Sequence, residues 1–158
     1  MKVSQQGNTV ILEDIKHFNP KHIFECGQCF RWIKQEDDSY TGVAMGKVIN
    51  VKQDGDKIYL DNTTKEDFDN IWYDYFDLGR DYEEMVNTLK VMDEYLEKAT
   101  EFGEGIRILK QDGWEMLISF IISANNRIPM IQRAINNLSK NYGTYIGEYK
   151  GQKYYAFP

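Results

Sequence analysis

The chain has 158 residues, of which 42% are hydrophobic and 14% aromatic, and a net charge of −6. This composition excludes an intrinsically disordered protein and allows one domain, or two small ones, with a hydrophobic core. No apolar run is long enough to span a membrane, and residues 1–12 lack the apolar centre of a secretory signal. We therefore expect a cytoplasmic protein without membrane contact, and its two cysteines are too few for a disulfide framework.

The sequence of residues 1–62 predicts short β-strands. Runs of β-branched and aromatic residues alternate with turn-forming residues, and their close spacing favours an antiparallel meander. A short helix is expected to begin at Asn19-Pro20. The expected strands are Thr9–Leu12, Phe30–Ile33, Tyr40–Met45, Val48–Val51 and Ile58–Leu60.

Residues 63–158 show the apolar spacing of about 3.6 that predicts helices. The aromatic stripe Phe68–Phe76 follows a capping threonine and is expected to face the core. The helix expected after Asp112 is apolar on almost every face, which predicts deep burial. No element is predicted for the tyrosine-rich tail from Thr144. Other helices are expected from Asp81, over Asp93–Phe102 and from Pro129 to Tyr142.

These patterns together predict an α+β fold. An antiparallel sheet region at 1–62 is followed by a helical region at 63–158. The charges are unevenly placed along these regions, because residues 54–104 carry −11 and residues 127–158 carry +4. Such asymmetry allows a basic face on an acidic protein, although ordinary solvated surfaces are the simpler explanation of the charges alone.

The segment Cys26-Gly27-Gln28-Cys29 has several interpretations when taken by itself. A thiol-redox motif needs its first cysteine at a helix N-terminus, but the residues that follow resemble a strand. A zinc site would need His17 and His22 as further ligands, in an unusual and crowded order. Alternatively, both cysteines are small buried hydrophobic residues at the start of a strand.

The longer segment Cys26–Trp32, Cys-Gly-Gln-Cys-Phe-Arg-Trp, resembles the Ser-Gly-Gln-Ser-Phe-Arg-Trp stretch of 8-oxoguanine DNA glycosylases. The resemblance implies that the carbonyl of Gly27 reads an oxidised base. Oxidation at C8 places a hydrogen on N7, where normal guanine has a bare acceptor. A fixed carbonyl is therefore expected to bond the lesion and to repel normal guanine. The candidate base-recognition residues are Gly27, Gln28, Cys29 and Phe30.

A second segment, Ser123–Met130, lies between two predicted helices. By itself it indicates a helix–helix turn whose asparagines satisfy free backbone groups. The stretch from Gln111 to Gly143 is similar to the same family, with a buried helix, a Ser-Asn-Asn turn and an amphipathic helix. The resemblance implies that Asn125 enters the space left by a flipped base. The candidate residues for contact with DNA and the opposite base are Asn125, Asn126, Arg127 and Met130.

Two of these positions depart from the family pattern. Arg127 stands where a third asparagine is common, close to the predicted DNA-facing turn. Met130 stands where an arginine would help to recognise cytosine opposite the lesion. Methionine has no donor for the acceptors of cytosine, so we expect weaker discrimination of the opposite base.

The resemblance implies the N-terminal part of a glycosylase/AP lyase of base-excision repair, with a TBP-like sheet, truncated before a helix-hairpin-helix element. In this family a lysine attacks the sugar and an aspartate assists, and both follow that element. Its Leu-Pro-Gly-Val-Gly type of turn is not found in this chain, whose prolines are at 20, 129 and 158. We therefore expect no catalytic residue, metal or cofactor here, and no glycosidic cleavage by the 158 residues alone.

The expected partner is double-stranded DNA that contains 8-oxoguanine, and the complete protein is expected to be a monomer. Two alternatives stay open at this point. One is a DNA- or ligand-binding module without chemistry, and the other is a small zinc or thiol protein that uses Cys26 and Cys29. The last helices and the tail are expected to expose apolar surface.

Overall fold

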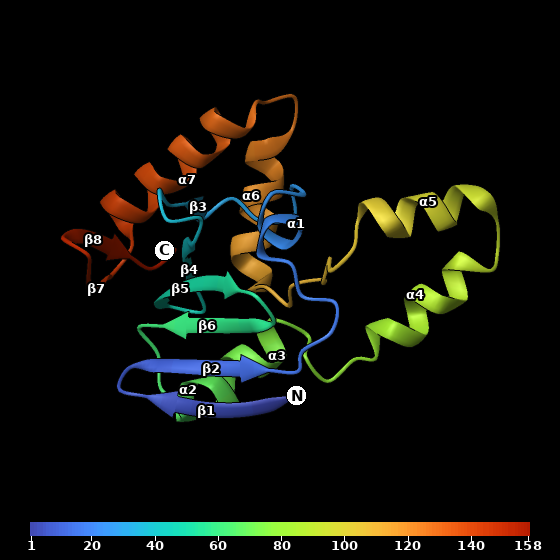
Figure 1. The fold of residues 1–158 in the computed structure, drawn as a ribbon. Coiled ribbons are helices and arrows are strands. Elements are labelled where there is room, and N and C mark those ends of the chain that lie inside the picture. The colour runs from blue at the N-terminus through green and yellow to red at the C-terminus, as the bar shows by residue number, and fades with distance from the viewer.

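The computed structural model describes residues 1–158 and has the expected α+β architecture (Figure 1). Its centre is an antiparallel sheet of six strands in the order β1-β2-β6-β5-β4-β3. The predicted strands are confirmed, and β1 is an addition. The strands are β1 (Lys2–Gln6), β2 (Thr9–Glu13), β3 (Trp32–Lys34), β4 (Tyr40–Ala44), β5 (Lys47–Asp54) and β6 (Lys57–Asp61).

The strand β1 has no apolar alternation because it lies at the edge of the sheet and is almost wholly exposed. The opposite edge strand, β3, begins at Trp32 and not at Phe30 as expected. Trp32 pairs with Gly42 of β4, and a Cβ atom at Gly42 would lie 2.3 Å from the indole ring. Gly42 therefore lets the indole ring lie directly against the neighbouring strand.

The main core lies between one face of the sheet and the helices α1 (Pro20–Phe24), α2 (Lys65–Asp67) and α3 (Tyr73–Tyr75). A π-helical turn, η1 (Phe68–Trp72), joins α2 to α3. The predicted aromatic stripe faces this core, where Phe68, Trp72 and Phe76 are fully buried. Phe24 stacks on Trp32 with 3.9 Å between the ring centroids. The aromatic rings thus attach the segment after α1 firmly to the sheet.

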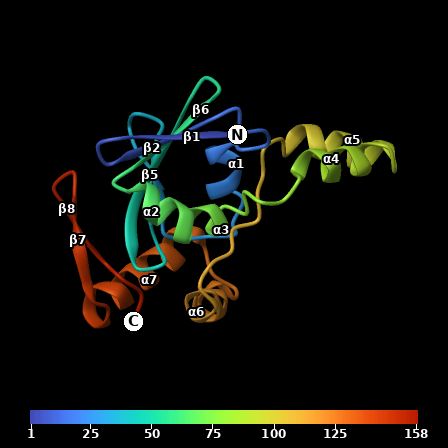
Figure 2. The ribbon, with the colours of Figure 1, turned by 90° about the horizontal axis from the view of Figure 1, so that it is seen from below.

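Helices α4 (Tyr82–Lys90) and α5 (Glu94–Phe102) form an arm that projects from the rest of the molecule (Figure 2). Their N-caps, Asp81 and Asp93, accept hydrogen bonds from backbone N–H groups of the first turn. Both starts were expected from the sequence. The segment after the arm passes the start of α1 and the end of α3, with backbone hydrogen bonds to Asn19 and Tyr75, and leads into α6.

Helices α6 (Gly113–Ser123) and α7 (Ile128–Tyr142) are followed by a hairpin of β7 (Tyr145–Tyr149) and β8 (Gln152–Tyr155), which was not expected. The expected deep burial of α6 is wrong for this structure. Only Ser119 of α6 is buried, and Phe120 is 73% exposed, because no other element packs against that side of the helix. No helix is both long and apolar enough to cross a membrane.

Candidate functional site

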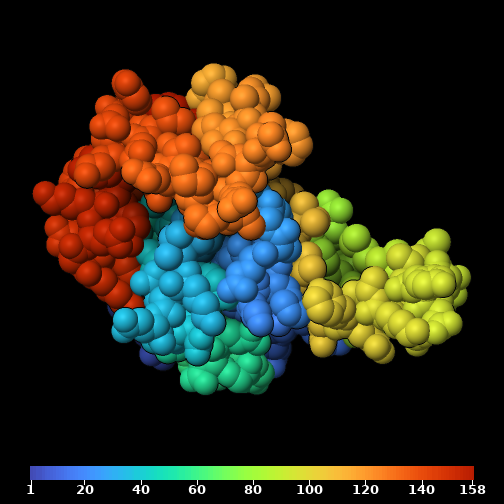
Figure 3. Space-filling model, turned by 90° about the horizontal axis from the view of Figure 1, so that it is seen from above, coloured from blue at the N-terminus to red at the C-terminus, as the bar shows by residue number.

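The two sequence motifs meet at one cavity of about 380 Å³. Its walls come from the loop after α1, from β3 and β4, and from the first turns of α7. Figure 3 shows the orange surface of α6 and α7 beside the blue surface of the N-terminal part of the chain. Gly27, Cys29 and Phe30 line the cavity on one side, and Ile128 and Gln132 of α7 line it on the other.

Gly27 lies in the loop with a φ of +86°, in the left-handed region that favours glycine. A Cβ atom here would meet nothing within 4 Å, so the backbone conformation and not the available space requires glycine. No backbone N–H group donates to the Gly27 carbonyl, which lies outside every helix and strand. The loop therefore offers a free acceptor beside the cavity.

The side chain of Gln28 fixes the position of this loop. Its Nε2 donates to the carbonyls of Ile23 (2.9 Å) and Arg107 (2.8 Å), and its Oε1 accepts from the N–H of Leu109 (3.0 Å). The Gln28 carbonyl accepts a further hydrogen bond from Gln111 Nε2 (2.6 Å). The side-chain amide of Gln28 is thus used in hydrogen bonds to the protein backbone, and none of its groups is free to contact a base.

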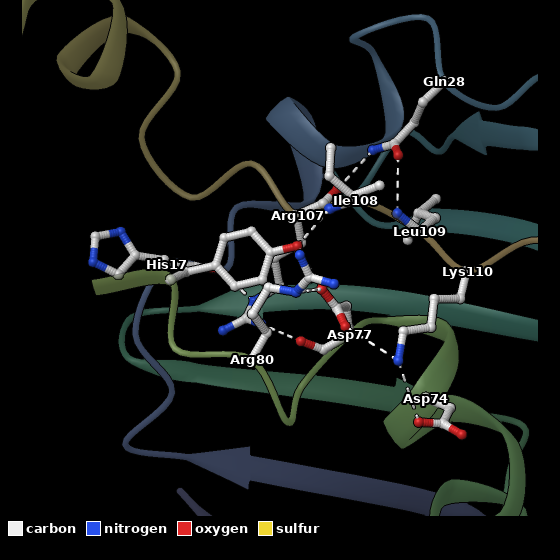
Figure 4. A network of polar contacts seen from close by, with 10 residues as sticks. His17, Gln28, Asp74, Asp77, Arg80, Arg107, Ile108, Leu109 and Lys110 are labelled. Atoms are coloured by element: carbon white, nitrogen blue, oxygen red, sulfur yellow. Dashed lines mark hydrogen bonds and ion pairs between the residues drawn. The ribbon is translucent and has the colours of Figure 1, made fainter. Parts of the chain in front are cut away.

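The segment bound by Gln28 is itself held by Arg107, which sequence reasoning missed (Figure 4). Arg107 is only 4% exposed, and its guanidinium donates to the carbonyls of His17 (2.7 Å), Asp77 (2.8 Å) and Lys16 (2.9 Å). The guanidinium also lies over the ring of Tyr82, 4.5 Å from its centroid. This network connects the loop to the sheet region and to the end of α3.

Asp77 completes the same network. Its carboxylate accepts from the Tyr82 hydroxyl (2.9 Å) and pairs with Arg80 (2.8 Å) and Lys110 (3.2 Å). Burial acts to raise the pKa of Asp77, but the hydrogen bonds from Tyr82 and Lys110 and the charge of Arg80 outweigh it and lower the pKa. The carboxylate therefore stays ionised and holds three partners around the segment that carries Arg107.

The two cysteines are not arranged as the zinc and thiol-redox alternatives require. Cys29 is buried, and this burial raises the pKa of its thiol, which opposes formation of a thiolate. Cys26 is exposed, and both thiols are free. No group of three or more His, Cys, Asp or Glu side chains is arranged to hold a metal ion, so His17 and His22 do not complete a zinc site. The zinc and thiol alternatives are therefore not favoured.

A polar pair forms another part of the cavity wall. The Tyr40 hydroxyl donates to Glu25 Oε1 at 2.6 Å, and both residues line the cavity. Burial and the neighbouring Glu25 carboxylate raise the pKa of Tyr40, so the hydroxyl keeps its proton. Together with the aromatic rings of Phe24 and Trp32, this pair gives a mainly apolar cavity with a few fixed polar groups.

The second motif forms the exposed turn between α6 and α7. Asn125 is exposed and has a φ of 52°, a left-handed conformation that asparagine tolerates better than most residues. Asn126 closes the turn, since its Nδ2 donates to the Ile122 carbonyl (3.1 Å) and its Oδ1 accepts from the N–H of Arg127 (2.8 Å). Arg127 is the N-cap of α7, and Met130 is 52% exposed one turn later.

Of the predicted site residues, the structure therefore brings Gly27, Cys29 and Phe30 to the cavity wall. Gln28 lies behind the wall and positions it. The remaining four, Asn125, Asn126, Arg127 and Met130, lie on the exposed rim at the start of α7 and do not line the cavity.

The comparisons with known proteins agree on one family. Residues 10–117 match the family model of the 8-oxoguanine DNA glycosylase, N-terminal domain. The N-glycosylase/DNA lyase of Saccharomyces cerevisiae is 32% identical over 151 residues, which span 87% of this chain and 40% of the yeast protein. The N-glycosylase/DNA lyase OGG1 of Arabidopsis thaliana is 26% identical over 146 residues, covering 85% of this chain and 38% of the plant protein.

Solved structures agree with these matches. MBOgg1 in complex with a low-affinity DNA ligand is 54% identical, with a TM-score of 0.95, and the match covers 99% of this chain and 54% of that one. The 8-oxoguanine glycosylase/lyase of Clostridium acetobutylicum, in complex with double-stranded DNA containing cytosine opposite 8-oxoguanine, is 49% identical, with a TM-score of 0.96. That match covers 100% of this chain and 54% of the Clostridium chain.

The chain thus spans about half the length of the solved relatives and less of the curated ones. Within that span the fold matches that of the solved relatives. The chain belongs to the 8-oxoguanine DNA glycosylase family and carries its N-terminal domain.

Proposed function

We propose that this chain binds double-stranded DNA containing 8-oxoguanine and holds the flipped lesion in the cavity between the Gly27 loop and α7. The observation that carries the proposal is the free carbonyl of Gly27 beside that cavity, in a loop fixed by Gln28. A base inside a duplex must leave the stack before an enzyme can act on it. The relatives solved with DNA, among them a complex containing 8-oxoguanine, support the same ligand class.

Selection between 8-oxoguanine and guanine depends on the hydrogen atom at N7. 8-Oxoguanine carries a hydrogen on N7, which can donate to the Gly27 carbonyl, whereas guanine presents a lone pair there. The two bases are nearly equal in size, so the shape of a cavity alone separates them poorly. A fixed acceptor adds attraction for one base and repulsion for the other.

The exposed turn has a different role in this proposal. Asn125 extends into the gap that the flipped base leaves in the duplex, and Arg127 neutralises a nearby phosphate. Asn126 supports Asn125 from within the turn, because its amide bonds the turn backbone. Met130, on the same rim, faces the opposite base without a polar group to read it.

The names of the relatives describe base removal and strand cleavage. We assign to these 158 residues the recognition part of that activity. The lysine and aspartate that the family resemblance implies for the chemical steps follow an element whose motif these residues do not contain. The proposal is therefore tested by binding.

The experiment compares three duplexes that differ only at one base opposite cytosine: 8-oxoguanine, guanine and 7-deazaguanine. The last has a carbon at position 7 and thus no lone pair to repel the Gly27 carbonyl. We expect the tightest binding for 8-oxoguanine, at least about tenfold tighter than for guanine, with 7-deazaguanine between them. Fluorescence anisotropy measures all three affinities.

Gln28→Ala tests the role of the fixed loop, because it frees the loop without changing any group that faces DNA. It is expected to reduce the preference for 8-oxoguanine more than the affinity for undamaged duplex. Equal affinity for the three duplexes in the unmodified chain would contradict the proposed recognition.

A further inference from the structure

A second open cavity, of about 480 Å³, lies at the other end of α7. It is bounded by the edge strands β3 and β4, by the C-terminal half of α7 and by β8. No acidic residue lines it. The residues that matter for its chemistry are Arg31, Lys34, Ser139, Lys140 and Lys153.

Arg31 is buried in the wall of this cavity with much of its hydrogen-bonding capacity unused. Its side chain is 7% exposed, and only Nη2 makes a hydrogen bond, to the Tyr155 carbonyl. Nε and Nη1 have no hydrogen-bond partner. The carboxylate of Glu115, on the side of a separate small cavity, forms an ion pair with Nη1 at 3.8 Å, a distance too long for a hydrogen bond.

Ser139 supplies a second unpaired group to the same wall. This residue of α7 is 2% exposed, and its Oγ has no hydrogen-bond partner. Buried polar groups are almost always paired, and an unpaired one costs free energy. Two such residues, Arg31 and Ser139, border one cavity, although they come from segments far apart in the sequence.

The mouth of the cavity adds positive charge. Lys140 and Lys153 are exposed and line it, as does Lys34, whose ammonium pairs with the exposed Asp38 at 2.8 Å. The negative end of the α7 dipole lies nearby, and Lys140 in the last turn offsets it. Arg31 and Lys34 are paired with Glu115 and Asp38, so the positive potential at the mouth comes from Lys140 and Lys153, which have no ion-pair partner.

We propose that this cavity binds the phosphate group of an anionic ligand, at a site beside the base cavity. Lys140 and Lys153 neutralise the charge of the phosphate at the mouth, and rotation of the Arg31 and Ser139 side chains brings their buried, unpaired donors to its oxygen atoms. The volume of the cavity is in the range of small-molecule sites. This inference does not depend on the proposed recognition of 8-oxoguanine.

The phosphate has two possible sources, a small soluble molecule or the DNA backbone. Ile128, at the base cavity, and Lys140 are twelve residues apart on α7, which corresponds to about 18 Å along the helix. The two cavities nevertheless share Ile33 and Lys34 and come within one turn of each other on α7, at Gln132 and Asn136, so a competition experiment is needed to distinguish the sources.

The test uses pyrophosphate as the probe and the 158-residue chain as the protein. We expect pyrophosphate to raise the melting temperature and to give a saturable calorimetric signal. The double variant Lys140→Ala/Lys153→Ala, at two exposed positions, is expected to bind pyrophosphate about tenfold more weakly or worse. Lys90→Ala/Lys98→Ala, on the distant arm, removes the same number of charges, serves as the control for a change of net charge and should bind like the unmodified chain.

Ser139→Ala separates a ligand-binding role from a structural one. It removes an unpaired buried hydroxyl, so the free variant should melt at the same or a higher temperature, while its affinity for pyrophosphate falls. A lower melting temperature with unchanged affinity would overturn the role of Ser139. No binding of pyrophosphate, or equal binding by the double variant, would overturn the site.

Competition with an undamaged duplex identifies the source of the phosphate. If the duplex displaces pyrophosphate from the unmodified chain, the cavity takes a backbone phosphate. If both bind at once, the cavity takes a small phosphate compound. Either result supports a phosphate site, provided that the double variant loses the pyrophosphate signal.

Discussion

The loop of residues 25–31 and the turn of residues 123–130 border the same cavity, but they are held in different ways. The loop is fixed by hydrogen bonds to residues far away in the sequence, from Gln28 to Arg107 and Leu109. The turn is fixed only by local bonds, such as that of Asn126 to Ile122, and its side chains are exposed.

This difference matches the two tasks that we assign to them. A carbonyl that separates two bases by one hydrogen must not move, because a mobile carbonyl could turn away from the lone pair of guanine. A turn that enters a gap in DNA has no partner until DNA is bound and gains from a small, adaptable side chain. The loop is therefore rigid, as base selection requires, and the turn is exposed, as contact with DNA requires.

The largest predicted effect comes from the network behind the loop. Arg107→Met leaves three backbone carbonyls without their buried donor, and we expect it to lower the free energy of unfolding by about 3 kcal/mol. The same change should abolish the preference for 8-oxoguanine over guanine in whatever fraction stays folded. Urea unfolding and duplex binding at low temperature measure the two effects.

Arg133→Met is the matched control, because Arg133 is exposed on α7. Its free energy of unfolding should lie within about 0.5 kcal/mol of that of the unmodified chain. If Arg107→Met were equally mild, the loop would not depend on the network, and the contrast with the turn would disappear.

Local sequence rules were sufficient for most of the fold. Asp81, Asp93 and Asp112 each cap a helix that begins at the next residue, because capping depends only on residues within one turn. The hairpin β7–β8 was not predicted, although Gly151 was a sequence signal for its turn. In the structure Lys150 and Gly151 both have the positive φ of a tight hairpin turn. Apolar composition misled for α6, since it reports the tendency to be buried and not which element will cover the helix.

The candidate site also combines residues that local motifs predict with residues that only distant contacts identify. Gly27 and Asn125 were found from motifs, and both have the positive φ that their positions in a loop and a turn require. Arg107 was missed because its acceptors lie 30 to 91 residues away, and no local pattern marks them. Sequence thus gave the groups proposed to face DNA, but not the network that fixes one of them.

Asn125 offers a smaller effect, confined to binding. Asn125→Gly removes the side chain and keeps the left-handed backbone, so we expect little change in stability and about tenfold weaker binding of the 8-oxoguanine duplex. Asn125→Ala removes the same side chain but strains the backbone, which should add a destabilisation of about 1 kcal/mol. If Asn125→Gly bound DNA normally, the turn would contribute no side chain to the complex.

Met130 should affect selectivity more than affinity. Met130→Arg places donors on the exposed rim of the turn, where they can reach the acceptors of cytosine. We expect a preference for cytosine over adenine opposite 8-oxoguanine that is larger by about 1 kcal/mol, or roughly fivefold, than in the unmodified chain. Met130→Lys supplies charge without the planar fork and should strengthen both complexes equally. A strong preference for cytosine in the unmodified chain would refute the interpretation of Met130.

The last effect, no larger than that expected for Met130, is a pH dependence on the loop side alone. Because the pKa of folded Asp77 lies below its ordinary value of 3.8, its contribution to stability is present above pH 3.8 and is lost as the pH falls through the folded pKa. Asp77→Asn should therefore be less stable at neutral pH, by about 1 kcal/mol since Arg80 and Lys110 are half exposed, and the difference should vanish in acid. Urea unfolding across this pH range measures it, and a difference that persists below the folded pKa would mean that the hydrogen-bonding groups of Asp77, and not its charge, hold the network.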